Sequence, residues 1–192
     1  MTLNLMLINQ HGIWQSSDFR LSHPETGDLV DDFSVKHVSF RCSDGAALLT
    51  YCGVGRVTPP RTAEVHLSDW IRQTIRGQSL TLDETVIRIC EQATADLGDL
   101  LLKIKRPHMF SIGAFIGRVP WLVQVRNFAG APNGIGPVQR EFETTAKKIE
   151  GAMAAWWPAI VSEADQGLMH KVVTKQPRKP RQFSDRGCPV GC

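Results

Sequence analysis

The sequence predicts an α+β domain in which two antiparallel β-sheets are sandwiched between flanking helices, an αββα arrangement. Three observations predict it: two β-hairpin patterns occupy the first third of the chain, a helical stretch follows, and a further pair of strand patterns comes after that stretch. Strands that are apolar on both sides need cover on both faces, and helices that follow them in the chain can provide it.

The first hairpin pattern begins at the second residue. Residues 2–9 are almost continuously apolar, which is typical of a strand covered on both faces, and residues 10–12 (Gln-His-Gly) supply a tight turn. Residues 13–17 then predict the return strand. A polar excursion follows, with turn chemistry over residues 23–28.

The second hairpin pattern is more distinct. Residues 33–41 have the alternating pattern of a β-strand, and residues 46–52 predict the strand that pairs with it. Between them lies Asp44-Gly45, a dipeptide that strongly favours a two-residue hairpin loop. If these two residues form the loop, counting outward sets Lys36 opposite Gly53.

The middle of the chain predicts two helices. The first spans residues 68–76, and four-residue apolar spacing from Leu67 indicates a start one turn earlier. Thr81 opens a capping-box pattern, and an apolar stripe continues from there to Ile104. This second stretch therefore predicts a helix that begins at Thr81 and continues to Ile104.

The remainder predicts a hairpin and then a helix. Residues 108–116 and 119–128 predict strands around a turn at residues 117–118. Residues 129–137 are rich in Gly and Pro and predict a loop. From residue 138 to residue 155 we expect a helix, because a proline directly precedes this segment.

Composition predicts one domain with a tail. The chain has 192 residues, of which 42% are hydrophobic, and this length can bury one substantial core. Its formal net charge is +3, but residues 171–192 hold six basic residues and one acidic residue, so the rest of the chain is slightly acidic. We expect a domain over residues 1–170 and a basic, disordered tail over residues 171–192. Short Pro-rich basic segments are more often solvated than bound to nucleic acid, which stays the lesser alternative for the tail.

No membrane segment is expected, because no apolar run approaches the ~18 residues that cross a bilayer. The first residues lack the basic region of a secretion signal, so we expect a cytoplasmic protein. Five cysteines are an odd number, and three of them lie in apolar segments, which argues against a disulfide framework. Cys188 and Cys192 lack zinc-site spacing, and the six histidines form no metal pair, so no metal or cofactor is expected.

Several short motifs occur in an order that resembles one family. Thr2 precedes the first apolar strand, Asp18-Phe19-Arg20 follows it, Lys36 comes next, and Gly53-Val54-Gly55 follows the second hairpin. This order resembles that of proteasome β-subunits and their bacterial relatives, which are N-terminal nucleophile (Ntn) hydrolases. The sixteen-residue step from Thr2 to Asp18 is that of the family, whereas Lys36 lies slightly later, as a small insertion would place it. The strand pair over residues 110–126 also resembles the family's central hairpin.

The resemblance implies a threonine-type peptidase or amidohydrolase with Thr2 as the nucleophile. Met1 precedes a small residue, a context in which the initiator Met is removed, so Thr2 is expected to carry a free α-amine that acts as the base. Lys36 is implied to lower the proton affinity of that amine, and Asp18 is implied to hold Lys36. Backbone N–H groups at Gly55 and at a helix start following it are implied to stabilise an oxyanion. The implied partners are an unidentified peptide or amide substrate and further copies of the chain, as a homo-oligomer.

Other interpretations of these residues remain. Without the resemblance, Thr2 and Lys36 are ordinary strand residues, Asp18 belongs to a solvated turn, and the two glycines serve packing. The family also places a Ser after the central hairpin to orient the terminal amine, and no matching Ser is found. The last quarter of the chain shows no resemblance, so we expect a fold shortened at its C-terminal side. The alternative function is that of a catalytically inactive proteasome-like structural or regulatory protein. Cys52 is interpreted as a core residue rather than a nucleophile.

Overall fold

The computed structural model describes residues 4–18, 21–22, 28–31, 33–58, 63–77, 79–131, 134–149 and 154–156. All of them belong to one unit, Met1–Ile160, and a second unit, Val161–Cys192, lies outside the described residues, as does the domain boundary predicted at residue 170. The elements in chain order are β1 (Asn4–Asn9), β2 (Gly12–Ser17), β3 (Leu21–Ser22), β4 (Leu29–Asp31), β5 (His37–Arg41), β6 (Gly45–Cys52), β7 (Arg56–Val57), β8 (Val65–His66), α1 (Leu67–Ile75), α2 (Leu82–Lys103), β9 (Met109–Ile116), β10 (Val119–Ala131), β11 (Gly134–Lys148) and β12 (Ala154–Trp156).

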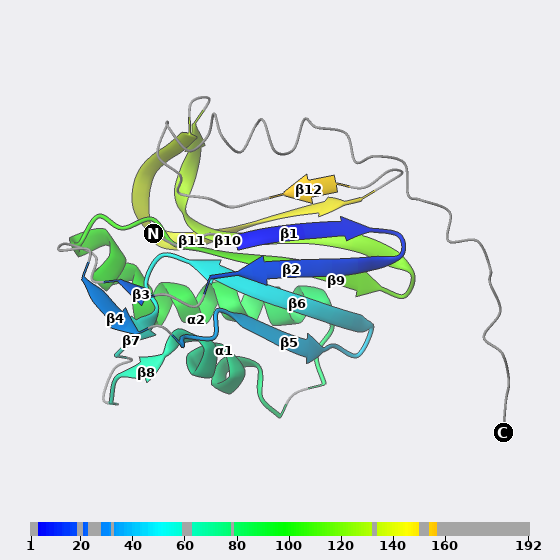
Figure 1. Ribbon diagram of the computed structural model, residues 1–192, viewed down its shortest axis with the longest axis horizontal. Coiled ribbons are helices and arrows are strands. Elements are labelled where there is room, and N and C mark those ends of the chain that lie inside the picture. The colour runs from blue at the N-terminus through cyan, green and yellow to red at the C-terminus, as the bar shows by residue number, and fades with distance from the viewer. Residues whose placement is uncertain are drawn as a thin grey trace, which may run out of the picture. The chain divides into compact units, whose positions relative to one another are not determined.

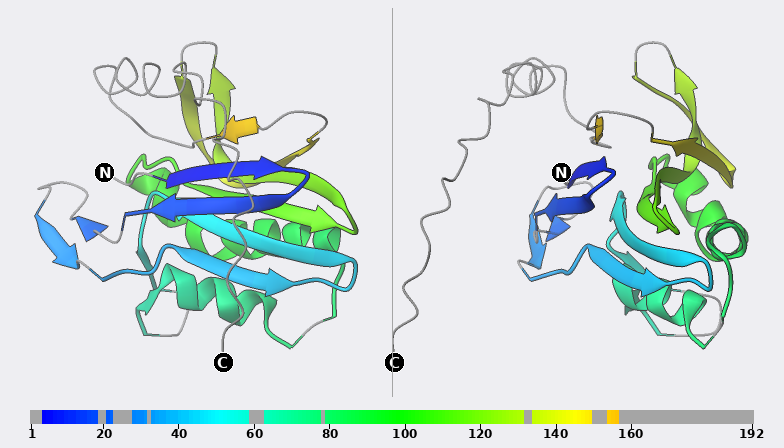
Figure 2. Two further views of the ribbon diagram at one scale, coloured as in Figure 1. Left: turned by 45° about the vertical axis from the view of Figure 1, so that its right-hand side comes forward. Right: turned by 90° about the vertical axis from the view of Figure 1, so that its right-hand side faces the viewer.

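The described elements form three layers. An antiparallel sheet has the strand order β11-β10-β9-β6-β5, and a smaller one has the order β12-β1-β2. Helices α1 and α2 cover one face of the larger sheet, where Leu49 and Ile112 share a buried cluster with Ile71 and Leu97, and β1 and β2 lie over its other face (Figures 1 and 2). The predicted α+β class with antiparallel sheets is confirmed, whereas the four-layer αββα sandwich stays a prediction.

The first predicted hairpin is confirmed over its described residues. β1 pairs with β2 from Asn4–Ser17 to Asn9–Gly12. Oδ1 of Asn9 accepts the backbone N–H groups of His11 and Gly12 at 2.8 and 3.2 Å, so a side chain closes the turn. The turn predicted over residues 23–28 lies mostly outside the described residues.

The second hairpin is present, but its predicted register is wrong. Backbone hydrogen bonds join Cys42 and Gly45, so the loop residues are Ser43-Asp44 rather than Asp44-Gly45. The ladder ends at the pair His37–Thr50, which excludes the predicted pairing of Lys36 with Gly53.

Close packing between strands explains this shift. Gly45 pairs with Ile116 of β9, and a Cβ on Gly45 would lie 1.9 Å from the carbonyl oxygen of Phe115. A glycine is therefore required inside the strand. The carboxylate of Asp44, in turn, accepts the N–H of Leu82 at 2.9 Å, which ties the loop to the start of α2.

Both predicted helices are confirmed. α1 begins at Leu67, one residue before the predicted cap Ser68, and His66 is its N-cap residue. Thr81 caps α2 as predicted: its hydroxyl accepts the N–H of Glu84 at 3.3 Å, and the Glu84 carboxylate accepts the N–H of Thr81 at 2.8 Å.

The predicted hairpin of residues 108–128 is confirmed as β9 and β10, but the segment after it is not a loop and a helix. β10 extends to Ala131, and residues 134–148 form β11, which pairs with β10 along most of its length. Val138 and Phe142 have helical spacing, yet the backbone of Phe142 bonds to α2, accepting from the Cys90 thiol and donating to Thr94. Pairing with a neighbouring strand and a helix thus overrides the local preference.

Candidate functional site

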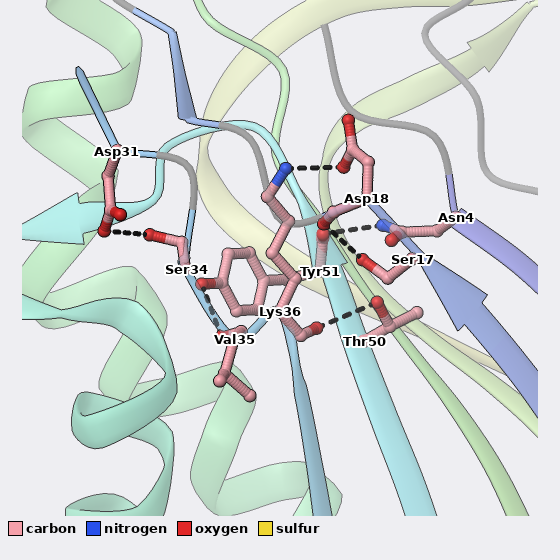
Figure 3. Close-up of polar contacts among 9 residues, drawn as sticks. All are labelled: Asn4, Ser17, Asp18, Asp31, Ser34, Val35, Lys36, Thr50 and Tyr51. Atoms are coloured by element: carbon pink, nitrogen blue, oxygen red, sulfur yellow. Dashed lines mark hydrogen bonds and ion pairs between the residues drawn. The ribbon is translucent and has the colours of Figure 1, made fainter. Parts of the chain in front are cut away.

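A buried ion pair joins two of the predicted site residues. The ammonium nitrogen Nζ of Lys36 lies 2.6 Å from Oδ1 of Asp18. The Lys36 side chain is 0% exposed, whereas that of Asp18 is 33% exposed and keeps contact with solvent. A lysine charge buried to this degree needs a partner, because the loss of its hydration is costly. The structure thus brings Lys36 and Asp18 together, as Figure 3 shows.

Side chains of β6 hold the backbone around Lys36. Asp18 directly follows β2, and Lys36 directly precedes β5, in a segment without strand pairing. The hydroxyl of Thr50 donates to the carbonyl oxygen of Lys36 at 2.9 Å, and the hydroxyl of Tyr51 donates to that of Val35 at 3.3 Å. These bonds fix a stretch of chain that the sheet itself does not order.

A carboxylate fixes the other end of this stretch. Oδ1 of Asp31 accepts the backbone N–H of Phe33 at 2.8 Å, and Oδ2 accepts the hydroxyl of Ser34 at 2.7 Å. The backbone bond first, and then the bond from Ser34, lower the pKa of Asp31 below its ordinary value. The ionised carboxylate therefore anchors the turn that leads to Lys36.

Asn4 ties the start of β1 to the larger sheet. Its side chain is fully buried, and its Nδ2 donates to the carbonyl oxygen of Tyr51 at 2.7 Å. Asn4 pairs with Ser17, the residue before Asp18, so the described start of β1 lies next to the strand that carries the carboxylate. Thr2 lies outside the described residues.

The loop over residues 53–55 rests on a buried histidine. Nδ1 of His108 accepts the backbone N–H of Val54 at 3.2 Å. Gly53 has a φ of +119°, and a Cβ there would lie 2.4 Å from the same nitrogen, so only glycine fits. Burial lowers the pKa of His108 to about 3, which keeps the ring neutral and its acceptor nitrogen available. Sequence analysis did not identify His108, because no local pattern links it to a loop more than fifty positions away.

Gly55 is not followed by a helix. Arg56 and Val57 directly after it form β7, and α1 begins only at Leu67, whose N–H donates to the carbonyl oxygen of Gly55 at 2.9 Å. A Cβ on Gly55 would lie 2.2 Å from Cδ2 of Leu21, so this glycine serves close packing. The prediction of a helix start directly after Gly55 is wrong, because β7 follows this glycine and the first N–H of α1 is bonded to its carbonyl oxygen.

Cys52 does not have the properties of a nucleophile. Burial raises its pKa to about 12, and neither the backbone bond with Met109 nor the charge of Lys36 offsets that effect. A thiol that stays protonated at neutral pH reacts poorly. This supports the interpretation of Cys52 as a core residue.

The interface between the two sheets is apolar at one end and polar at the other. Its apolar end is one buried cluster, made of Met6, Ile8, Leu122 and Ile149. Toward the start of β1 it holds buried Asn4, Thr50 and Ser111 instead. Oδ1 of Asn4, both amide atoms of Gln15 and Oγ of Ser111 are buried without a hydrogen-bond partner among the described residues. Such atoms are costly, and they are typical of functional sites and of enclosed water.

Two further properties hold for the part of the chain that the structure describes. No group of three or more His, Cys, Asp or Glu side chains is arranged there to hold a metal ion. Neither described helix is long and apolar enough to cross a membrane.

Comparison with known proteins gives one structural likeness. No protein-family model matches the chain, and no curated protein matches it in sequence. Among solved structures, it is similar to the Anbu (Gly-1) mutant from Hyphomicrobium sp. strain MC1, at 12% sequence identity and a TM-score of 0.42. The match covers 79% of this chain and 62% of the other, so the chain spans less than two thirds of the length of that neighbour. Anbu is a proteasome-like protein related to Ntn hydrolases.

Proposed function

We propose that this chain is an Ntn-hydrolase-like protein that cleaves a peptide or amide bond, with Thr2 as its N-terminal nucleophile. The observation that carries the proposal is the buried Lys36–Asp18 ion pair, which lies at the polar end of the sheet interface, where β1 begins. Burying an ammonium group costs free energy of desolvation, so its burial at that place favours a functional role for the charge.

The course of β1 supports a place for Thr2 beside this pair. Asn4 is opposite Ser17, and Asp18 is the next residue of the partner strand. The described start of β1 therefore lies beside the end of β2, where the carboxylate of the pair follows.

The proposed chemistry is acyl transfer in two steps. The neutral α-amine of Thr2 takes the hydroxyl proton while Oγ bonds to the substrate carbonyl carbon, and the proton then passes to the leaving amine as the C–N bond breaks. Water hydrolyses the resulting ester and restores the hydroxyl. Lys36 favours the neutral amine by like-charge repulsion, and Asp18 keeps Lys36 in position.

For the oxyanion we propose the backbone N–H of Gly55 as a donor. The glycine loop is well suited to hold a fixed geometry, because Val54 is bonded to His108 and Gly55 is packed against Leu21. A preorganised donor stabilises developing negative charge without rearranging during the reaction.

A second candidate is a catalytically inactive proteasome-like protein with a structural or regulatory role. It is favoured by the lack of a Ser that matches the family's amine-orienting residue, and by the capacity of a buried ion pair to serve structure alone. Under either candidate, the resemblance carries our proposal of a homo-oligomer, and the cytoplasmic location expected from the sequence stays a proposal.

Covalent trapping tests the catalytic proposal. A peptide β-lactone reacts with a nucleophilic hydroxyl: Oγ bonds to the lactone carbonyl carbon, the ring C–O bond breaks, and the ring oxygen takes the proton. The whole mass of the probe is therefore added to the chain. We expect one adduct per chain, assigned to Thr2 by fragmentation of the N-terminal peptide.

Two variants serve as controls for this reaction. Thr2→Ala removes the hydroxyl and should abolish the adduct, whereas Lys36→Met removes the ammonium group and should slow labelling by about 100-fold or more. An adduct that is absent from the wild-type chain, or that forms equally in Thr2→Ala, would refute the catalytic proposal and favour the inactive candidate.

A further inference from the structure

Three polar side chains from three strands carry buried, unbonded atoms in the interface between the two sheets. They are Asn4 of β1, Gln15 of β2 and Ser111 of β9. Oδ1 of Asn4, both amide atoms of Gln15 and Oγ of Ser111 are buried, and none of these four atoms has a hydrogen-bond partner among the described residues. A buried polar atom without a partner costs free energy, so these atoms require a group that can bond to them.

The contact between β9 and the smaller sheet shows where these side chains lie. A Cβ on Gly113 of β9 would be 2.8 Å from Sδ of Met6 and 3.0 Å from Cγ2 of Ile13, so these two side chains rest directly on that glycine. Each of the three polar residues is two positions from one of these contact residues and therefore lies on the same face of its strand. Because β1 and β2 are antiparallel, the two-residue steps to Asn4 and to Gln15 run in the same direction.

The step along β9 takes that direction as well. Nδ2 of Asn4 donates to the carbonyl oxygen of Tyr51 at 2.7 Å (Figure 3). Tyr51 pairs with Phe110, which directly precedes Ser111. The three polar side chains therefore gather on the same side of Gly113, and we call them the interface polar group.

The chemistry of the interface polar group determines which ligand fits it. Oδ1 of Asn4 only accepts, whereas the amide of Gln15 and the hydroxyl of Ser111 both donate and accept. None of the three side chains is charged. A cation would leave the N–H and O–H donors unused, and an anion would be repelled by the oxygen of Asn4. A water molecule donates and accepts, and about two to four polar partners hold it inside a protein, so water matches this mixed, neutral set.

We infer that the interface polar group holds ordered water, which bridges β1 and β2 to β9. The water donates to Oδ1 of Asn4 and bonds to the amide of Gln15 and the hydroxyl of Ser111. It thus satisfies polar atoms of both sheets at a place where the sheets do not bond to each other through these side chains. The inference is independent of the proposed function, because it needs no nucleophile and holds equally for a catalytically inactive protein.

Oxygen-17 magnetic relaxation dispersion of the solvent tests this inference. The method detects water that stays inside a folded protein, and it is not affected by hydroxyl protons that exchange with the solvent. The double variant Gln15→Met/Ser111→Ala leaves Oδ1 of Asn4 as the one remaining member of the group, which is too few partners to hold water. We expect the dispersion amplitude of the folded double variant to fall by the equivalent of about one water molecule per chain or more.

Ser39→Ala is the matched control. Ser39 pairs with Leu48, which pairs with Gly113, so it lies on the same face of the larger sheet as Ser111. Ser39 is exposed, and its loss should leave the dispersion amplitude at the wild-type value. A folded double variant that also keeps the wild-type amplitude would overturn the inference.

A high-resolution crystal structure of the wild-type chain gives a second test, which does not depend on the folding of a variant. It should show a water oxygen about 2.7–3.2 Å from Oδ1 of Asn4 and within the same distance of Gln15 or Ser111. Direct hydrogen bonds among the three side chains, or bonds from them to a residue outside the described ranges, would overturn the inference.

Discussion

The two members of the Lys36–Asp18 ion pair are unequally buried, and this asymmetry predicts unequal effects of their removal. Asp18→Asn leaves an ammonium group with 0% exposure beside a neutral partner. Lys36→Met leaves a carboxylate that is 33% exposed and can be hydrated. Asp18→Asn should therefore destabilise the fold more than Lys36→Met does, although both break the same bond.

The distances and exposures give the magnitudes. At 2.6 Å the attraction is about 6 kcal/mol for an effective dielectric constant of about 20, and desolvation of the lysine opposes it. Removing one partner of a buried pair costs about 3–5 kcal/mol, which we expect for Asp18→Asn. For Lys36→Met we expect about 1–2 kcal/mol, because solvent compensates the remaining carboxylate and the methionine side chain fills the apolar part of the space.

Urea denaturation of the two single variants and the double variant measures these values. The double variant should be more stable than Asp18→Asn alone, since it removes the buried charge together with its partner. Equal losses in the two single variants, or a double variant less stable than both, would refute the assignment of Lys36 as the desolvated member of the pair.

Three further predictions concern the support of the site and the fold. The folded-state pKa of His108, about 3, lies below its ordinary 6.5, so the unfolded chain binds the extra proton in that window. The free energy of unfolding should then fall as the pH drops from 6.5 toward 3, by up to about 1.4 kcal/mol per unit, and His108→Gln should lack this slope in urea titrations at each pH. Gly53→Ala should lower the free energy of unfolding by more than about 2 kcal/mol, because its Cβ would clash with His108. Gly77 also has a positive φ but open space around it, so Gly77→Ala should lower it by only about 1 kcal/mol. Equal losses of stability in the two variants on thermal denaturation would contradict close packing of His108 against Gly53. In urea denaturation, Thr81→Ala should lower the free energy of unfolding by about 1 kcal/mol, and Thr81→Ser by much less, since serine keeps the cap. A Thr81→Ala variant as stable as the wild type would argue against the capping box.

Local patterns predicted the parts of the fold whose contacts are local. The capping box at Thr81 and the apolar stripe after it predict α2, because a helix satisfies its backbone within itself. The first hairpin is defined by neighbouring residues, and its pairing from Asn4–Ser17 to Asn9–Gly12 follows the same logic. β11 was mistaken for a helix because its strand pairing and its bonds to α2 involve residues far away in the chain.

The candidate site was likewise predicted only in part from the sequence. The motif order singled out Asp18 and Lys36, and the ion pair between them agrees with the association expected from the resemblance. Asn4 and His108 were not identified, because their partners are 47 and 54 positions away and neither belongs to a recognisable motif. The predicted register of the second hairpin was wrong for a related reason, since the close approach of Phe115 to Gly45 is a contact between strands far apart in the sequence.

The central claim is that the α-amine and hydroxyl of Thr2 act together, and the intact mass of the purified chain tests it most directly. We predict the mass of the sequence without Met1, so that Thr2 carries the free amine that the reaction uses as its base. A chain that retains Met1 has that amine one residue too early, and this result would contradict the account while leaving the Lys36–Asp18 pair as a structural feature.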